Sequence, residues 1–398
     1  MSATPIQRSV DEVTRARAFP RILIDPWLLL ATVGLVVCSL VTIRGATRND
    51  VDGAPTWFFD RQLGYALVGL TLMFAIARFD YSRLRELKVG VYATLIGLNL
   101  LVLAVGGATR GSRRWIDLPF FQFQPSELGK VLLIVALAGF AVDRARRLHE
   151  RETTARLMLL ALGAATLVML QPDLGTALVY VALALTVLFL AGTPGRQLGG
   201  LIGLFAVATV LVLVAAPAVG VHVLKPYQVE RLTGFVNPSH DPDDATYQVN
   251  QSLIAIGSGE KVGRGVERAT QTGLNFLPEH HTDFVFSVVG ETYGFAGAAF
   301  VLSLYALLIW RILRIITLAK NLFGALIAGG ILAMLMYQVF VNVGMTIGIM
   351  PITGVTLPLM SFGGASYLTT FLALGLLQSI HVQGRIAQGS KGRALLTT

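Results

Sequence analysis

Residues 26–43 read PWLLLATVGLVVCSLVTI, a run without a single charged side chain. An α-helix needs about 20 mostly apolar residues to cross the hydrocarbon layer of a membrane, so this run predicts a transmembrane helix. A basic segment that contains Arg8, Arg15, Arg17 and Arg21 precedes the run, as in a secretory signal. No small-residue cleavage site follows, and we therefore expect the helix to be retained.

Nine further apolar runs follow along the 398 residues, separated by polar or Gly/Pro-rich segments. The chain is 54% hydrophobic and only 14% charged, against about 25% charged residues in soluble domains. These features exclude a soluble fold and predict an all-α, polytopic integral membrane protein with about ten transmembrane helices. The expected helices cover residues 26–43, 62–77, 88–105, 127–142, 156–170, 174–191, 198–219, 284–310, 322–343 and 366–381.

The distribution of basic residues predicts which ends of the helices face the cytoplasm, because cytoplasmic loops retain an excess of Lys and Arg. With the N-terminus inside, the inner segments hold 20 of the 32 basic residues and the outer segments hold 11. We therefore expect two cytoplasmic tails, residues 1–25 and 382–398, around a membrane domain over 26–381. Anionic membrane lipids explain the net charge of +9, and no nucleic-acid partner is needed.

Two of the expected outer loops, 106–126 and 220–283, are long and rich in basic residues. An anionic ligand at the outer surface would explain this excess, and so would a surface that faces anionic lipid headgroups. The second loop contains the glycine-rich stretch 257–265, with Lys261 and Arg264. This stretch lacks a preceding strand and the Walker Gly-Lys-Ser/Thr ending, so we interpret it as a flexible loop whose amides can approach an anion, not as a nucleotide site.

The stretch LPEHHTDF at 277–284 places two carboxylates and two histidines directly before an expected helix. Asp283 could simply cap that helix, with Glu279 solvated. From the residues alone, capping is the favoured interpretation. A carboxylate at the membrane boundary is also partly desolvated, which would make it a better proton acceptor, so Asp283 is in addition a candidate general base. The spacing of His280 and His281 fits no standard zinc pattern, and we predict no metal site here.

A second group of polar residues lies around the start of the fourth expected helix. Glu127 and Lys130 are three residues apart, and both would be costly in lipid unless they pair or face a polar cavity. Pairing alone would explain them. Arg113, Arg114 and Trp115 in the preceding loop would add guanidinium groups for phosphate and an aromatic face, although an interfacial Trp is often only a membrane anchor.

Three further features of the sequence are candidates for a structural or functional role. Asp173, at the start of the sixth expected helix, could cap the helix or act in a site. Glu291 lies inside the eighth expected helix, where an ionisable residue is a functional candidate by default. Prolines and glycines interrupt residues 351–364, which predicts a broken or re-entrant segment buried in protein or lining an outward cavity.

The residues above belong to a longer series of short motifs along the chain. These are RWI (114–116), FQPSE (123–127) with Lys130, QPDLGT (171–176), NP (237–238), DP (241–242), YQV (247–249), IAIGSG (254–259), FLPE (276–279), HTDF (281–284), GE (290–291) and the 351–364 run. Taken together, these motifs resemble the SEDS family of bacterial cell-wall polymerases, which includes RodA and FtsW. They occur in the order and with the spacing of that family, and their sequences are closer to the RodA branch. One departure is Thr292, where the family usually has a second Glu after Glu291.

The resemblance implies glycosyl transfer from lipid II onto a growing glycan strand at the outer face of the bacterial cytoplasmic membrane, for cell elongation and shape. It also implies that Asp283 is the essential carboxylate. An inverting displacement needs one base for the acceptor hydroxyl and positive charge for the leaving pyrophosphate, which agrees with the residue types found. The expected substrate-binding residues are Arg113, Arg114, Trp115, Glu127, Lys130, Asp173, Lys261, Arg264 and Glu279.

The same resemblance implies a class B penicillin-binding protein transpeptidase as partner. A divalent cation, Mg²⁺ or Mn²⁺, could share the pyrophosphate charge, although no cation site is recognisable in the sequence. Two other functions stay open at this stage: a lipid II flippase, which would need polar groups near the midplane and on both faces, and a non-catalytic scaffold for the transpeptidase. An FtsW-type division polymerase is the alternative within the family.

Overall fold

The computed structural model describes residues 24–48, 50–51, 53–109, 112–118, 121–215, 217 and 244–395. In this part of the chain, ten long helices correspond one by one to the ten predicted spans. Eight are long and apolar enough to cross a membrane, α7 is shorter, and α3 carries Asp60 and Arg61 near its start. The helices are α2 (Pro26–Ala46), α3 (Trp57–Ala77), α4 (Lys88–Val105), α5 (Pro125–Asp143), α6 (Arg151–Leu170), α7 (Leu174–Leu190), α8 (Gly195–Val210), α13 (Val285–Leu318), α14 (Leu322–Thr346) and α15 (Gly364–Leu395).

Several helices extend beyond the apolar runs that predicted them. The last helix continues from His381, its expected end, to Leu395, so most of the expected C-terminal tail is helical. The helix α13 likewise continues to Leu318. Helix α8 is α-helical to Val210 and continues as a π-helical turn (Leu211–Ala215), and its expected end at residue 219 lies outside the described residues. Hydropathy follows the thickness of the apolar layer, whereas a helix can continue into polar surroundings where its backbone remains hydrogen-bonded.

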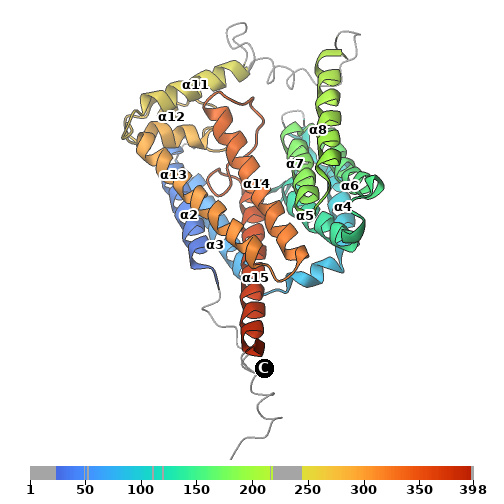
Figure 1. Cartoon of the computed structure of the whole chain (residues 1–398). Coiled ribbons are helices and arrows are strands. Elements are labelled where there is room, and N and C mark those ends of the chain that lie inside the picture. The colour runs from blue at the N-terminus through green and yellow to red at the C-terminus, as the bar shows by residue number, and fades with distance from the viewer. Residues whose placement is uncertain are drawn as a thin grey trace, which may run out of the picture.

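Helix α15 runs through the middle of the bundle, and its C-terminal end projects from one end of it (Figure 1). It packs most extensively against α3, while α13 packs on α2 and α14, and α5 lies among α4, α7 and α14. In the most apolar stretch of α15, 83% of the residues are buried within the protein, whereas in that of α8 only 6% are. Helix α15 therefore forms the centre of the core, and α8 lies at the periphery.

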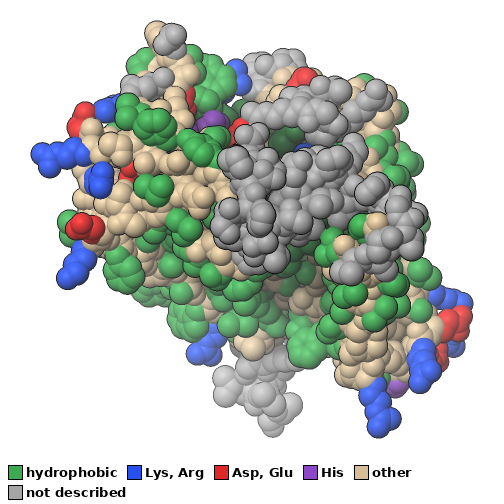
Figure 2. Space-filling view, turned by 90° about the horizontal axis from the view of Figure 1, so that it is seen from above, with side chains coloured by type: hydrophobic (Ala, Val, Ile, Leu, Met, Phe, Trp, Pro, Cys, Tyr) green, Lys and Arg blue, Asp and Glu red, His purple; other side chains and the backbone are tan. Residues whose placement is uncertain are grey.

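The opposite end of the bundle carries the strands and the two short α-helices, and we call it the site end. Helices α2, α4, α6, α8 and α14 end there, and α3, α5, α7, α13 and α15 begin there. A small antiparallel sheet of order β1-β2-β3 follows α4, so the first long loop is partly folded. On the face viewed in Figure 2, charged side chains gather mostly at the edges. The strands and short helices of the site end are β1 (Gly107–Thr109), β2 (Ser112–Asp117), β3 (Gln122–Phe123), α11 (Asp244–Ser258) and α12 (Thr270–Gly273). The 3-10 helices η2 (Tyr81–Arg85) and η3 (Ala145–Arg147) lie at the other end.

The interrupted stretch between α14 and α15 has no helix over residues 347–363, as its prolines and glycines predicted. We call it the connecting segment. Many of its side chains are buried, Leu357 and Met360 almost completely. Its backbone carbonyls find side-chain donors: Ser39 on α2 donates to Met360, Gln62 on α3 to Ser361, and Tyr305 on α13 to Pro358. Irregular backbone at this depth is tolerated because the surrounding helices satisfy it.

Candidate functional site

Asp283 lies half-buried at the end of a tight turn, residues 277–284, directly before α13. The carbonyl of Glu279 accepts hydrogen bonds from the backbone amides of Thr282 (3.1 Å) and Phe284 (3.3 Å). Leu277 and Phe284 bury their side chains at the two ends of the turn, in a small apolar cluster with residues of α14 and the connecting segment. The turn therefore has a fixed conformation and holds the Asp283 carboxylate at the site end.

Asn342, a buried amide on α14, anchors this turn to the connecting segment. Its Nδ2 donates to the backbone carbonyl of Asp283 at 2.9 Å and to that of Val355 at 2.8 Å. A second bond runs from the Phe362 amide to the His281 carbonyl at 2.8 Å. Sequence reasoning did not assign Asn342 to the site. An amide within an otherwise apolar span was the available signal, because such a group must find partners.

Glu279 has its own local role in the turn. Its φ of +53° lies in the left-handed region. The hydroxyl of Thr282 donates to its Oε2 at 2.9 Å and to its carbonyl at 3.2 Å. The side chain thus helps close the turn that carries Asp283. Contact of Glu279 with substrate stays a prediction.

Lys130 and Glu127 form the ion pair that their spacing predicted. Lys130 Nζ lies 2.7 Å from Glu127 Oε1, and the two side chains are only 2% and 10% exposed. Both lie in the first turns of α5, where Pro125 occupies the first helical position. Buried charges of this kind are stable only when paired, and each side chain supplies the counter-charge of the other.

Asp173 caps α7 and also joins it to α5. Its Oδ1 accepts from the Thr176 amide at 3.1 Å, and its Oδ2 accepts from Gln124 Nε2 at 3.0 Å. Arg114 on β2 approaches the same carboxylate at 4.0 Å. We call Arg114, Gln124, Glu127, Lys130 and Asp173 the α5 cluster. The capping interpretation of Asp173 is therefore confirmed, while binding of substrate by this residue is not tested.

Of the two other candidates in this loop, Trp115 and Arg113, the structure describes the side chain of Trp115 only. Trp115 is half-buried on β2, paired in register with Gly107 of β1. Arg113 belongs to the same strand, but its side chain lies outside the described residues, as do Arg110, Lys225 and Arg231.

The connecting segment lies between the α5 cluster and the Asp283 turn. On one side it meets the start of α7 so closely that a Cβ on Gly175 would lie 2.6 Å from the carbonyl oxygen of Thr353. On the other side it is bonded through Asn342 to Asp283. The predicted base and the predicted cations of α5 therefore flank the same buried segment, although they are more than 150 residues apart in the chain.

Lys261 and Arg264 lie elsewhere at the site end, on the connection between α11 and α12. This connection packs against the kink in α13 at Gly294, whose φ is +65°. The amide of Ala296 donates to the Lys261 carbonyl at 3.0 Å. Both basic side chains are exposed, and Arg264 donates from Nε to the Ser258 carbonyl at 2.9 Å. Contact of either residue with substrate stays a prediction.

Glu291 has a structural role in this region. Its fully buried carboxylate accepts from the amides of Gln271 (2.8 Å) and Thr272 (3.0 Å) and from the Thr272 hydroxyl (2.6 Å). These bonds satisfy the free amides at the start of α12 and hold the loop on α13. The carboxylate is thus fully occupied, which explains its position inside a membrane helix.

An aromatic group borders the Asp283 turn and was not predicted. The ring of Phe58 lies 4.6 Å from the His281 ring and 5.0 Å from Phe362, and Tyr65 lies 6.1 Å from Phe362. Arg61 stacks over Trp57 at 4.1 Å. Rings of this kind at the membrane boundary offer an apolar surface for a lipid chain or the face of a sugar. The aromatic run at 57–59 was the only sequence signal for this group.

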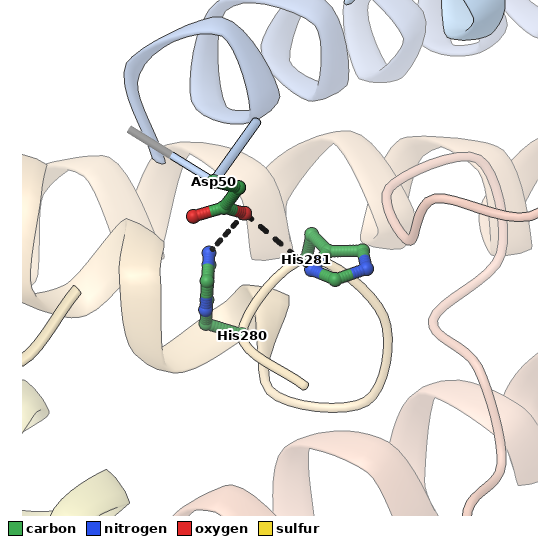
Figure 3. A group of neighbouring side chains, drawn as sticks. All are labelled: Asp50, His280 and His281. Carbon is green, nitrogen blue, oxygen red and sulfur yellow. Dashed lines mark ion pairs between the residues drawn. The ribbon is translucent and has the colours of Figure 1, made fainter. Parts of the chain in front are cut away.

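One group of metal-ligand type is present among the described residues: Asp50, His280 and His281 (Figure 3). Asp50 comes from the loop between α2 and α3, and the histidines come from the Asp283 turn. The sequence did not connect Asp50 with these histidines.

Comparison with known proteins identifies the family of the chain. A family model described as cell cycle protein, of the FtsW, RodA and SpoVE type, matches residues 20–386. The chain belongs to this family. Peptidoglycan glycosyltransferase MrdB of Escherichia coli K12 is 35% identical over 380 residues, covering 96% of this chain and 99% of MrdB. A probable peptidoglycan glycosyltransferase FtsW of Thioalkalivibrio sulfidiphilus is 37% identical, covering 96% and 95%.

Solved structures of the family share the fold. The rod shape determining protein RodA of Thermus thermophilus matches with a TM-score of 0.65 at 32% identity, covering 91% of this chain and 97% of that one. A chain from a structure described as "Structural coordination of polymerization and crosslinking by a peptidoglycan synthase complex" matches with a TM-score of 0.76 at 34% identity, covering 91% and 99%. The motifs that suggested the SEDS family thus led to the correct family.

Proposed function

We propose that this chain polymerises lipid II into glycan strands at the outer face of the bacterial cytoplasmic membrane. The chain is a peptidoglycan glycosyltransferase, the activity named for relatives that match it over nearly its whole length. The observation that carries the mechanism is the half-buried Asp283 carboxylate, whose backbone Asn342 fixes at the site end.

In this mechanism Asp283 accepts the proton of the acceptor hydroxyl as that oxygen attacks the anomeric carbon of the donor sugar. The bond to the pyrophosphate breaks in the same step, with inversion and without a covalent intermediate. The α5 cluster supplies positive charge for the leaving group through Lys130 and Arg114. Glu127 holds Lys130 in place, as their 2.7 Å contact indicates. Trp115 and the aromatic group at Phe58 and Phe362 would border the lipid or sugar.

A divalent cation would enter this site with the substrate. The described carboxylates of the α5 cluster already have partners: Glu127 pairs with Lys130, and Asp173 accepts from Thr176 and Gln124. They form no dedicated cage, whereas Mg²⁺ and Mn²⁺ commonly bind through substrate phosphates. We therefore expect Mg²⁺ or Mn²⁺ to share the pyrophosphate charge without a protein site of its own in this cluster.

The site end faces outward in this proposal. The excess of basic residues in the segments at the other end supports cytoplasmic termini. At that end the exposed Arg314 lies over the ring of Trp310, at 5.9 Å, an arrangement suited to anionic lipid headgroups. A bacterial cytoplasmic membrane location follows for a protein of this family.

We propose a class B penicillin-binding protein transpeptidase as partner, which would cross-link the strands made here. Support comes from the similarity to a chain of a synthase complex that coordinates polymerisation and crosslinking. We assign the chain to elongation because its motifs resemble the RodA branch, and division is the alternative because FtsW relatives match equally well.

Polymerisation of fluorescent lipid II by purified protein in detergent tests the function and the base together. Asp283→Asn should lower the rate by at least about 10²-fold, the lower range for loss of a general base. Asp117→Asn is the matched control, since this exposed carboxylate lies at the same end on β2. A flippase would give no polymer in detergent, and substantial polymer from the Asp283 variant would refute the base assignment.

A further inference from the structure

The Asp50 carboxylate lies between the rings of His280 and His281 (Figure 3). Its Oδ2 is 3.1 Å from His280 Nε2 and 4.0 Å from His281 Nδ1. The Asp50 and His280 side chains are 11% and 6% exposed, and the His281 side chain is 21% exposed. Three potential ligand atoms from two separate loops thus converge, all within 4.8 Å of one another.

One ring nitrogen of His280 bonds to the backbone, and the other, Nε2, faces the Asp50 carboxylate. Its Nδ1 lies 3.1 Å from the Leu277 carbonyl, which can only accept, so Nδ1 carries the hydrogen. In a neutral ring, Nε2 then presents a lone pair to the Asp50 oxygen, and two lone pairs repel. Protonation of Nε2 would remove this repulsion, but Nε2 and the Asp50 oxygen are not aligned for a hydrogen bond. Among the described residues, Asp50 Oδ1 has no hydrogen-bond partner either.

A bound cation resolves both features, because it accepts the lone pairs of the imidazoles and the carboxylate at once. Ligand bonds of about 2.0–2.1 Å at tetrahedral angles place neighbouring ligand atoms roughly 3.4 Å apart, between the two distances observed. Two imidazoles with one carboxylate suit zinc and similar transition metals more than Mg²⁺ or Ca²⁺. The bond from His280 Nδ1 to a backbone carbonyl is the outer-shell contact that orients a metal-ligating histidine.

We propose that Asp50, His280 and His281 form a binding site for one divalent transition-metal ion of the zinc type. The three residues leave a coordination position for water. The ion ties the loop between α2 and α3 to the turn that carries Asp283. The same loop makes a second contact through Arg48, whose guanidinium donates to the Glu267 carboxylate at 3.0 Å. This hydrogen bond lowers the pKa of the Glu267 carboxyl. The site is separate in its residues from the α5 cluster and does not depend on the proposed glycosyl transfer.

Direct metal binding tests the proposal without any substrate. Full-length protein carrying an affinity tag without histidine is stripped with a chelator, and zinc is then titrated calorimetrically, with the visible absorption of Co²⁺ reporting nitrogen and oxygen coordination. We expect one ion per chain. Asp50→Asn and His280→Gln should each weaken zinc binding by at least about 100-fold, since even outer-shell losses cost 10–100-fold. His149→Gln, an exposed histidine on the other end of the bundle, should bind as the unchanged protein does.

Thermal unfolding with and without zinc is a second measurement, and it compares each variant with itself, so a variant of low stability can still be interpreted. Zinc should raise the unfolding temperature of the unchanged protein and of the His149 variant, and should leave that of the Asp50 variant unaltered. Failure of the unchanged protein to bind zinc, or equal binding by the Asp50 and His280 variants, would overturn the proposal. Either result would leave the polymerase proposal intact, because that proposal rests on lipid II polymerisation and Asp283.

Discussion

The buried pair of Lys130 and Glu127 allows structural and catalytic roles to be separated. At 2.7 Å and an effective dielectric constant of about 20, the attraction between unit charges is about 6 kcal/mol. Desolvation of the two charges offsets much of this. Removing only one partner leaves an uncompensated buried charge, which costs about 3–5 kcal/mol. Lys130→Met and Glu127→Gln should therefore each lower the free energy of unfolding by about that amount.

The double variant Glu127→Gln/Lys130→Met removes both charges together. No unpaired ion remains, so its stability should return to near that of the unchanged protein, with a coupling free energy of about 3 kcal/mol or more. If Lys130 stabilises the leaving pyrophosphate, polymerisation should not return with stability. The expected loss in rate is about 10²–10³-fold, as for removal of one group that stabilises developing negative charge.

The assays are equilibrium unfolding in mixed detergent and lipid II polymerisation per folded molecule, measured for all four members of the cycle. A double variant that is stable and polymerises at the unchanged rate would show that the pair only holds α5 in place. A double variant no more stable than either single one would refute the assumption that a stranded charge causes the destabilisation.

The remaining predictions concern the parts that hold the site. Asn342→Leu removes two hydrogen bonds to buried carbonyls, so it should cost about 1–3 kcal/mol of stability and reduce polymerisation, whereas Gln338→Leu, one turn away on α14, should retain activity. Gly175→Val forces the connecting segment away from α7 and should cost about 1–3 kcal/mol and lower polymerisation; Gly203→Val, with open space around it, should have neither effect. Glu291→Gln should lower the thermal unfolding temperature yet leave polymerisation per folded molecule unchanged, and loss of activity in stable protein would contradict its structural role.

Much of the fold could be read from hydropathy, because each membrane span needs a long apolar run. The ends of the spans could not, since α3 begins at Trp57 and α15 continues to Leu395, both outside the apolar runs that predicted these helices. Within the site, Glu127 and Lys130 were found because they are close in sequence and costly when unpaired. The interruption before α15 was found because prolines and glycines mark it.

Contacts between distant parts of the chain were beyond this reasoning. Asn342 bonds Asp283 across 59 positions, and Asp50 meets His280 across 230. Neither local sequence indicates which residue the partner will be. The partners meet only because α14 and α2 pack against α13. The same holds for Lys261 and Arg264, whose connection between α11 and α12 bonds to the kinked part of α13, a contact that their local sequence did not indicate.

The end of the bundle opposite the site bears on the choice between polymerase and flippase. There the fully buried Asp25 accepts from Arg311 Nε at 3.0 Å, and its backbone exchanges hydrogen bonds with Gln378 on α15. A flippase must open both ends in turn, and opening this one would disturb the buried ion pair and its bonds to α15. A polymerase needs access from the site end alone. The fixed pair at one end and the connecting segment between Asp283 and the α5 cluster at the other therefore favour catalysis at a single face.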